Sequence, residues 1–271
     1  MKNIIVIIGI GGMGIAIARR IGRGNRLVLA DFDNMKLHAA ARELINAGYE
    51  VEAVVLDIIN RKSVEDLAET ASQLGEIHAV IHTAGLSPTM SDAQRILDVN
   101  LIGTGRIIET FQKHMKAGSV GIIIASMAGH MSTRYDNILE KQQWSAAADE
   151  LKIFVDSLEI KQSAEAYSIS KKANILQVQA AAVNWAEKGA RILSISPGII
   201  SNPMVGVEKR KQSAKNYTLE NATVKRMVTP EDIAAAVEFL QSSQASFITG
   251  TDLLIDGGVT SFTKNLQLNS H

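Results

Sequence analysis

The sequence contains no cysteine among its 271 residues, which excludes disulfide bonds and thiolate catalysis. It also has no net charge, because 28 lysines and arginines balance 28 aspartates and glutamates. No broad electrostatic field therefore attracts nucleic acid or an anionic membrane surface. No apolar run reaches the roughly 18 residues that a membrane-spanning helix needs. These absences predict a cytoplasmic protein whose partners are neither nucleic acids nor membranes.

The N-terminus imitates a signal peptide only loosely. Lys2 precedes an apolar run and small residues follow at Ala16 and Ala18, but five glycines lie between Gly9 and Gly22. So many glycines make a poor apolar core for a signal peptide, and we expect the N-terminus to be retained. His78, His82, His114 and His130 show no zinc-ligand spacing with suitable partners, so no metal site is predicted.

Apolar residues form 46% of the chain, which is ample for a core. Short β-branched runs alternate with helical patterns along the whole length, and no linker or repeat divides them. This alternation predicts one α/β domain over residues 1–271, a Rossmann-type doubly wound parallel sheet of about seven strands with helices on both faces. The expected strands are residues 3–8, 26–30, 51–56, 77–81, 120–125, 191–195 and 253–255. The expected helices begin near residues 15, 36, 63, 98, 165 and 230.

A glycine-rich turn follows the first expected strand and precedes a helix. Gly9, Gly11 and Gly14 match the pattern G-x-G-x-x-G, which lets backbone amides and the helix N-terminus approach a pyrophosphate. Asp31 ends the second strand, 22 residues after Gly9, close to the spacing of the acid that binds the adenosine ribose. A carboxylate there repels a 2′-phosphate, which favours NAD over NADP. Asp33 is a rival for this role, but we expect it in the following turn or as a helix cap.

Tyr167 and Lys171 are four residues apart in a helical segment, which places them on one face of the helix. A nearby ammonium group favours the phenolate and lowers the pKa of a tyrosine from about 10 towards neutrality. Such a tyrosine can exchange protons at the pH where an enzyme works. The spacing is common on helix surfaces, so the pair needs support from the rest of the chain.

That support comes from a set of motifs in a fixed order. The glycine turn is followed by Asp57, Ala84-Gly85, Val99-Asn100, Ser126, Tyr167 with Lys171, Pro197-Gly198 and Asp256-Gly257-Gly258. In this order the motifs resemble the short-chain dehydrogenase/reductase family, and the resemblance extends from Ile4 to about Gly258. No single motif is decisive, and the ordered set carries the resemblance.

The resemblance implies a catalytic tetrad that interconverts a small-molecule secondary alcohol and a ketone. Tyr167 is then the general acid/base, and Lys171 lowers the pKa of Tyr167 and binds the nicotinamide ribose. Ser126 orients and polarises the substrate oxygen, while Asn100 holds a water that links Lys171 to solvent. Hydride passes directly between nicotinamide and substrate, without a metal.

The resemblance also implies the residues that bind the cofactor, expected to be NAD rather than NADP. The pyrophosphate lies along the turn that contains Gly9, Gly11, Gly12, Met13 and Gly14. The other expected contacts are Asp31 and Phe32 at the adenosine ribose, Asp57 and Ile58 beside adenine, Ala84 and Gly85 behind the second ribose, Pro197 and Ile200 beside the nicotinamide, and Tyr167 and Lys171.

Two departures from the family pattern affect the cofactor site. The loop from Gly9 to Gly12 is one residue shorter than usual, which changes the backbone cradle for the pyrophosphate. His82 and Thr83 replace two asparagines, so a turn-stabilising side chain differs.

The largest departure is a helical insert at about residues 131–162, because forty residues separate Ser126 from Tyr167. Helices are expected over residues 136–148 and 151–158, the second from its apolar spacing of i, i+3, i+4 and i+7. Both ends of the insert adjoin catalytic residues, so it is either a substrate lid or an element that packs on the body or a partner subunit. The lid residues would be Met131, Tyr135, Trp144 and Phe154. Similar inserts in some hydroxysteroid dehydrogenase/carbonyl reductase members point to a bulky apolar substrate.

These features favour an NAD(H)-dependent alcohol dehydrogenase or ketone reductase. The alternatives are an NADP-preferring carbonyl reductase and a non-catalytic dinucleotide-binding redox sensor; enoyl reductases space their tyrosine and lysine more widely. Family members commonly pair through two long helices, here about residues 100–116 and 165–188, so a homodimer or homotetramer is expected.

Overall fold

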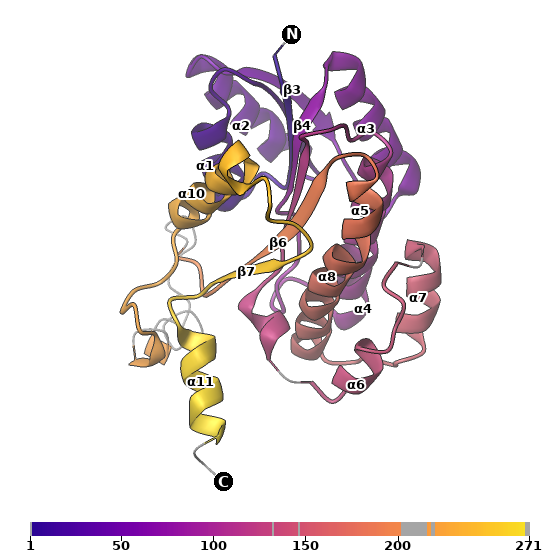
Figure 1. Cartoon of the computed structure of the whole chain (residues 1–271), viewed down its shortest axis with the longest axis vertical. Helices are drawn as coiled ribbons and strands as arrows, with labels where there is room; N and C mark the ends of the chain where they lie inside the picture. Colours follow the sequence, from indigo (N-terminus) through magenta and orange to yellow (C-terminus); the bar gives the residue numbers. More distant parts are fainter. Residues whose placement is uncertain (1, 132, 146, 202–215, 218–219, 269–271) are drawn as a thin grey trace.

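The computed structural model describes residues 2–131, 133–145, 147–201, 216–217 and 220–268. Seven strands form one parallel sheet in the order β3-β2-β1-β4-β5-β6-β7, with helices on both faces (Figure 1). This confirms the predicted fold class. The strands are β1 (Ile4–Ile8), β2 (Arg26–Asp31), β3 (Glu50–Val55), β4 (Ile77–His82), β5 (Val120–Ile124), β6 (Arg191–Pro197) and β7 (Asp252–Ile255).

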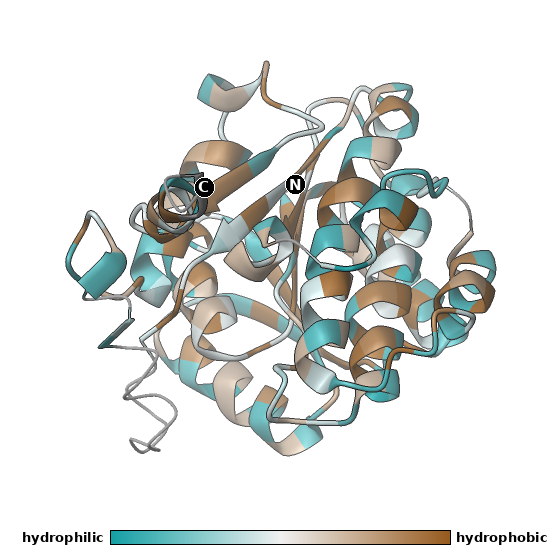
Figure 2. Cartoon of the chain, turned by 90° about the horizontal axis from the view of Figure 1, so that it is seen from below, coloured by the Kyte–Doolittle hydropathy of each residue, from teal (hydrophilic) through white to brown (hydrophobic). Residues whose placement is uncertain are grey.

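Strand β1 shows why both faces of the sheet are apolar. All five of its residues are buried, and successive side chains point to opposite faces. Ile5 and Ile7 belong to the core on one face, whereas Ile4, Val6 and Ile8 belong to the core on the other. A strand covered on both faces must be apolar throughout, which accounts for its uninterrupted aliphatic sequence. In Figure 2 the central strands are accordingly hydrophobic, and the helices around them are mixed.

Two groups of helices cover the sheet (Figure 1). On one face lie α1 (Gly12–Ile21), α2 (Asn34–Asn46) and α10 (Pro230–Gln241). On the other lie α3 (Arg61–Leu74), α5 (Thr104–Gln112) and α8 (Ser163–Ala186).

The helices begin where side chains satisfy their free N–H groups. Thr229 caps α10 in a capping box with Asp232, as its sequence predicts. Asp33 caps α2 by accepting a hydrogen bond from the Lys36 amide, which confirms the capping role expected for it. Helix α3 begins two residues before the predicted start at Ser63, because the Asn60 side chain accepts a hydrogen bond from the Ser63 amide.

The order of the strands places the site. From β1 the chain runs outward to β2 and β3, then crosses back to β4 on the other side of β1. At such a reversal the loops after the two central strands diverge and leave a crevice at the carboxyl edge of the sheet. The Thr83 and Ala84 amides, in the loop after β4, both donate to the Ile8 carbonyl, at 2.7 and 3.0 Å. The loops after β1 and β4 therefore meet at this edge.

The helix predicted over residues 98–116 begins with a π-helix. Residues Asp98–Gly103 form the π-helix η1, and α5 follows directly. The short helix α4 (Ala93–Leu97) precedes η1 and was not predicted. π-Helical turns are rare and often occur at functional sites. Here η1 contains Asn100.

The insert at residues 131–162 contains two helices, α6 (Asp136–Leu139) and α7 (Ala148–Asp156). The predicted extent of the first, residues 136–148, is wrong, because α6 is only one turn long. The chain turns after it, and the Trp144 indole donates to the Leu139 carbonyl at 2.7 Å. This bond satisfies a carbonyl at the end of α6 that a longer helix would have paired.

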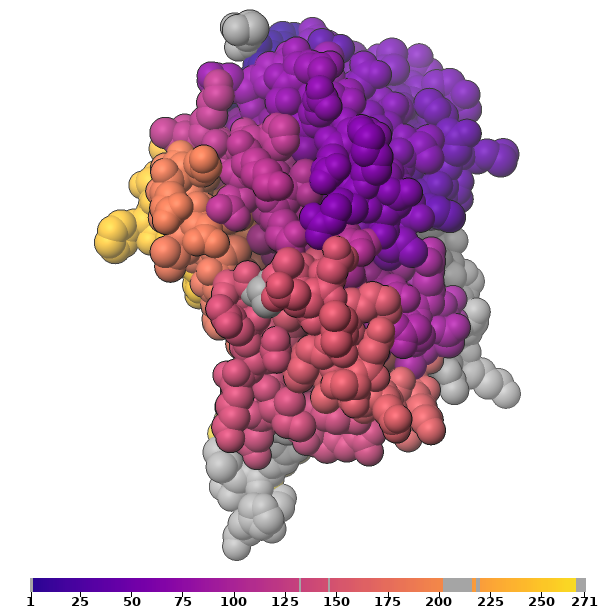
Figure 3. Space-filling view, turned by 90° about the vertical axis from the view of Figure 1, so that its right-hand side faces the viewer, coloured from indigo at the N-terminus to yellow at the C-terminus, as the bar shows by residue number. Residues whose placement is uncertain are grey.

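A third apolar core joins the insert to the body (Figure 3, where the insert is pink to salmon). In this core Leu139, Leu151 and Val155 of the insert pack with buried residues of α4, η1 and α8. An ion pair between Lys152 Nζ and Asp98 Oδ1, at 3.0 Å, also joins α7 to η1. The insert is therefore an integral part of the helical layer.

After β7 the chain forms α11 (Val259–Leu268), a helix that was not predicted. It projects from the body at the end opposite the N-terminus (Figure 1). Among the described helices none is long and apolar enough to cross a membrane.

Candidate active site

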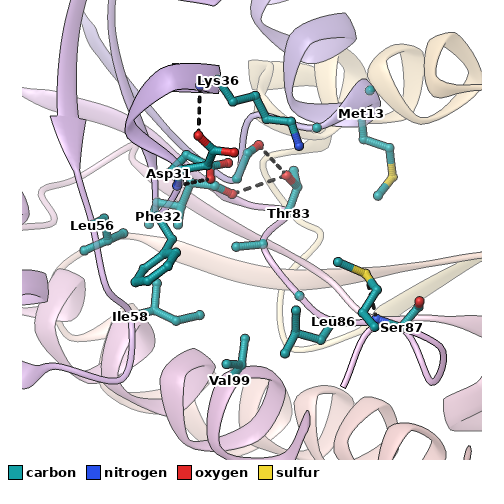
Figure 4. A pocket seen from close by; sticks show the side chains of 18 of the residues that line it. Met13, Asp31, Phe32, Lys36, Leu56, Ile58, Thr83, Leu86, Ser87 and Val99 are labelled. Atoms are coloured by element: carbon teal, nitrogen blue, oxygen red, sulfur yellow. Dashed lines mark hydrogen bonds between the residues drawn. The ribbon is translucent and has the colours of Figure 1, made fainter. Parts of the chain in front are cut away.

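A cavity of about 810 Å³ lies at the carboxyl edge of the sheet, between the loops after β1, β2, β3 and β4 (Figure 4). It is lined by most of the residues that the sequence assigns to the cofactor. These are Gly9, Gly11, Gly12, Met13, Asp31, Phe32, Asp57, Ile58, Ala84, Gly85 and Ile200.

The glycine turn divides into two pairs with different roles. Gly9 has φ +95°, and a Cβ on Gly14 would lie 2.0 Å from the Gly9 carbonyl oxygen, so these two glycines allow the turn itself. A Cβ on Gly11 would meet no atom within 4 Å, and one on Gly12 would meet only Pro230 Cγ, at 3.8 Å. Gly11 and Gly12 thus leave space in front of the backbone. Gly14, which was predicted to contact cofactor, lines neither this cavity nor its neighbour.

The start of α1 fits a phosphate group. Its N-cap, Gly11, provides no side-chain hydrogen bond to the first amides of the helix, and Gly11, Gly12 and Met13 line the cavity. Free amides and the helix dipole favour an anion at this position. A dinucleotide pyrophosphate would be held here by backbone N–H groups, in the open space that the two glycines provide.

The Asp31 side chain is hydrogen-bonded to the glycine turn. Its carboxylate accepts hydrogen bonds from the Ile10 amide at 2.6 Å and from the Asp33 amide at 3.0 Å. Both bonds fix a negative charge beside the glycine turn, at the wall of the cavity (Figure 4). Phe32, with 67% of its surface exposed, follows directly along that wall.

Sequence reasoning missed several residues that line the same cavity. The signal for Lys36 was its place in the first turn of α2, five residues after Asp31. The others lie in β1, α4, η1, the first turn of α10 and the connecting loops, and no cofactor motif singles them out. The missed residues are Ile8, Lys36, Leu56, Thr83, Leu86, Ser87, Met90, Ser91, Arg95, Val99 and Pro230. Asp33, the rival to Asp31, lines the cavity too.

A smaller cavity of about 170 Å³ adjoins the first and shares part of its wall. It brings together Ser126, at the end of β5, and Tyr167 and Lys171, on α8. Pro197 lines it from the end of β6. Three of the four predicted catalytic residues therefore lie beside the open glycine cradle, as their order in the sequence requires.

Lys171 is buried with its ammonium group inside the molecule. Nζ donates to the Ile124 carbonyl at 2.9 Å and lies 5.9 Å from the centre of the Tyr167 ring. Gly85 makes room for it, since a Cβ there would lie 3.5 Å from Nζ. Loss of hydration lowers the pKa of Lys171 from its usual 10.5 to about 8. The residue keeps its charge at neutral pH but loses it more easily than an exposed lysine.

The environment of Tyr167 differs from the one predicted. Burial raises the pKa of its hydroxyl above the usual 10, and a hydrogen bond with the Ser126 side chain partly opposes this effect. The net shift of the Tyr167 pKa is therefore upward, opposite to the lowering predicted from Lys171. The reason is that burial removes water from the phenolate, while the ammonium group is directed at the Ile124 carbonyl.

Asn100 is fully buried behind the cavity and lines neither part of it. Its side-chain amide accepts from the Leu86 amide at 2.7 Å and donates to the Leu86 carbonyl at 2.9 Å. The backbone carbonyl of Asn100 accepts hydrogen bonds from Thr104 Oγ1 at 2.7 Å and from Asn174 Nδ2 at 2.8 Å. Asn100 thus fixes the loop after β4 at Leu86, and the expected role of holding a water stays a prediction.

His82 and Thr83, which replace two asparagines of the family pattern, take on separate tasks. Thr83 Oγ1 donates to the Gly9 carbonyl at 2.7 Å and so connects the loops after β1 and β4. His82 is buried, with Nε2 at 3.0 Å from Thr104 Oγ1. Burial, together with the nearby charge of Lys171, lowers the pKa of His82 to about 3, so the ring is neutral at physiological pH.

Two further expectations can be compared with the described part of the chain. The insert residues that the structure describes line neither cavity, so packing on the body, rather than a lid, matches the arrangement. No group of three or more potential metal ligands occurs among the described residues.

Comparison with known proteins gives consistent results. The profile described as short chain dehydrogenase matches residues 2–136, and one described as enoyl-(acyl carrier protein) reductase matches residues 153–260. The chain is 36% identical to the short-chain dehydrogenase/reductase bsc3 of Alternaria brassicicola, over 96% of this chain and 97% of that protein. It is 28% identical to 3beta-hydroxysteroid dehydrogenase 1 of Eggerthella lenta, over 96% and 94%. A short-chain type dehydrogenase/reductase structure from Mycobacterium ulcerans superposes with a TM-score of 0.78 at 22% identity, covering 96% and 90%.

Proposed function

Because the chain belongs to the short-chain dehydrogenase/reductase family of oxidoreductases, we propose that it interconverts a secondary alcohol and a ketone with NAD(H). The observation that supports this most is the meeting of Ser126, Tyr167 and Lys171 in one small cavity beside an open glycine cradle. When bound, the nicotinamide accepts or supplies the hydride.

The residues of the small cavity suit the proton transfer that accompanies such a step. Ser126 and Tyr167 line the same cavity, so a substrate oxygen placed between them can receive a hydrogen bond from each hydroxyl. Tyr167 then gives a proton to the ketone oxygen in reduction, or takes one from the alcohol in oxidation. The Lys171 ammonium, 5.9 Å from the Tyr167 ring, favours the phenolate whenever Tyr167 has lost its proton.

The choice of NAD over NADP rests on Asp31. Its carboxylate is held at the cavity wall by two backbone amides, so it cannot swing away from an incoming 2′-phosphate without losing both bonds. The NADP-preferring alternative has one observation in its favour, because Lys36 and Arg95 line the same cavity and carry positive charge. We favour NAD because the fixed acid lies next to the glycine turn, whereas Lys36 is exposed.

An apolar substrate fits the lining of the smaller cavity. Leu86, Met90 and Ile200 contribute to it beside the catalytic residues, and Met13 lies on the same wall. The similarity to a 3beta-hydroxysteroid dehydrogenase agrees with a bulky, apolar alcohol. We therefore propose hydroxysteroid-like secondary alcohols as the first substrates to assay.

The test is a panel of secondary alcohols, hydroxysteroids included, assayed with NAD and with NADP by the absorbance of the reduced cofactor. The proposal predicts turnover of at least one apolar alcohol, with a higher kcat/KM for NAD than for NADP. Tight NADH binding without turnover of any alcohol or ketone would instead support the redox sensor. Reduction of an enoyl thioester, with no alcohol oxidised, would support an enoyl reductase, although the Tyr167–Lys171 spacing argues against one.

A further inference from the structure

The turn that carries Ser126 is bonded to strand β7 by a histidine that the proposed proton transfer does not use. This turn is the 3₁₀-helix η2 (Met127–His130), with Ser126 as its N-cap. At its other end His130 Nε2 lies 2.8 Å from Asp252 Oδ2. Since a carboxylate only accepts hydrogen bonds, Nε2 carries the proton and donates it.

Asp252 is a fixed anchor for this bond. Only 6% of its side chain is exposed, and its second oxygen accepts from Ser194 Oγ at 2.5 Å and from Ser196 Oγ at 3.0 Å. Both serines are fully buried in β6. A buried carboxylate that loses one of its donors keeps the cost of burial without the compensating bond, so all three donors hold it in place.

The other contacts of η2 lead directly to the catalytic residues. A Cβ on Gly129 would lie 2.8 Å from the carbonyl carbon of Lys171, so η2 packs tightly against the α8 backbone at that residue. Within the turn, Ser126 Oγ accepts from the Ala128 amide at 3.2 Å, and the Gly129 amide donates to the Ser126 carbonyl at 2.9 Å. Movement of any part of η2 therefore moves Ser126.

We infer that His130 is a positioning residue, whose bond to Asp252 holds η2 so that Ser126 meets Tyr167. The same carboxylate binds Ser196, and the next residue, Pro197, forms another wall of the catalytic cavity. The buried Asp252 carboxylate thus fixes two walls of the catalytic cavity relative to each other. The inference rests on the proposed function in assigning Ser126 and Tyr167 to catalysis, but its geometry does not require a particular substrate.

The bond between Ser126 and Tyr167 gives the inference a direct readout. That bond lowers the pKa of Tyr167 against the larger, opposite effect of burial. The charged group beside the ring, Lys171, lies on α8 and does not depend on His130. If η2 loses its anchor, the bond to Ser126 weakens and the pKa of Tyr167 rises.

The experiment compares three variants in the ligand-free protein. His130→Leu removes the donor, and His130→Gln keeps an N–H near the position of Nε2. His38→Leu, on the exposed surface of α2, is the matched histidine control. The phenolate absorbance of each protein is titrated with pH, and the curve of the same protein carrying Tyr167→Phe is subtracted. The difference isolates one of the four tyrosines.

The inference predicts that His130→Leu raises the Tyr167 midpoint by about 0.5 to 1 pH unit, the range that one hydrogen bond provides. His130→Gln should restore most of the wild-type midpoint, and His38→Leu should equal it. A wild-type midpoint in His130→Leu, or a His130→Gln midpoint as high as that of His130→Leu, overturns the inference. If His130→Leu does not fold, His130→Ala replaces it, because alanine also lacks a donor; a wild-type midpoint there also overturns the inference.

An activity measurement separates this inference from the proposed function. With an alcohol from the panel, His130→Leu should lower kcat about tenfold with little change in the KM for cofactor, and should add little in a Ser126→Ala background. Additive effects of the two substitutions overturn the positioning role. No turnover by the wild-type protein contradicts the proposed function alone, because the titration still decides the role of His130.

Discussion

At the scale of single residues, burial controls ionisation around the catalytic cavity. It raises the pKa of Tyr167, lowers that of Lys171 to about 8 and lowers that of His82 to about 3. In each case the charged form loses hydration that the surroundings do not fully replace. The Tyr–Lys spacing selected two residues that line the same cavity, but it carried no information on how deeply the pair is buried. The direction of the Tyr167 shift was therefore beyond prediction.

His82 should make the folded protein sensitive to acid. Its pKa is about 3 in the folded state and near the usual 6.5 when unfolded, so between these pH values the unfolded state binds one more proton. The free energy of unfolding should therefore fall by about 1.4 kcal/mol per pH unit from this residue as the pH drops from 6.5 towards 3.

The measurement is urea unfolding at several pH values in this window, for the wild type and for His82→Asn. The asparagine does not titrate. The variant should show the shallower decline below pH 6.5. Equal slopes for both proteins would mean that His82 is already protonated in the folded state.

Asp31 should determine which dinucleotide is preferred. Asp31→Asn removes the negative charge and keeps an oxygen that can accept one of the two backbone bonds. We expect the ratio of kcat/KM for NAD to that for NADP to fall by roughly tenfold or more, equivalent to about 1.4 kcal/mol. Asp33→Asn, which retains a good helix cap, is the matched control and should change the ratio less. A larger effect of Asp33→Asn would assign the discrimination to Asp33.

At the scale of the elements, the insert stabilises the catalytic face without lining it. Helix α7 packs on η1, which contains Asn100, and Asn100 in turn fixes Leu86 at the wall of both cavities. Lys152 strengthens the same contact through Asp98. We therefore propose that the insert acts on the site through packed helices, in contrast to a lid, which would contact the substrate.

Substitutions at two positions on α7 test whether the insert packs on the body or acts as a lid. Leu151 is 1% exposed in the core between insert and body, whereas Ile153, two residues on, is 74% exposed. Leu151→Ala should lower the free energy of unfolding by about 2–5 kcal/mol through lost packing, and Ile153→Ala should change it by no more than about 0.5 kcal/mol. Chemical denaturation measures both values.

The KM for the alcohol distinguishes a packing element from a lid, because only a lid contacts the substrate. Folded Leu151→Ala protein should keep the wild-type KM under conditions where it is stable. A KM raised several-fold in either variant, with stability unchanged, would favour the lid.

Helices and strands could be predicted where the residues that determine them are close together in the sequence. The strands and the caps of α2 and α10 follow from alternation and capping residues that are contiguous in the sequence. In contrast, the π-helix η1 has no periodic signature, and α6 ends early because of the contact between Trp144 and Leu139. The role of Gly14 in the turn, rather than at the ligand, depends on a spatial contact, because a Cβ there would lie 2.0 Å from the Gly9 carbonyl oxygen.

At the scale of the whole molecule, the parallel sheet order places the residues that the sequence spreads over most of its length. Gly12, Asp31 and Gly85 meet at one edge because each lies at or just after the end of a different strand. Helix α8 places Tyr167 and Lys171 at the same edge. Pattern and order could therefore predict this assembly. The expected homodimer or homotetramer depends on surfaces of two copies and stays a prediction, which light scattering can test.

The central claim is that Tyr167 transfers the proton while the glycine turn and Asp31 bind NAD. The most direct test is the kcat of Tyr167→Phe with the best alcohol of the panel, together with its affinity for NADH. The account predicts that kcat falls by about 10²–10⁴-fold, because the phenol is the proton carrier, while NADH binds about as tightly as to the wild type. A variant that retains wild-type turnover would contradict the account.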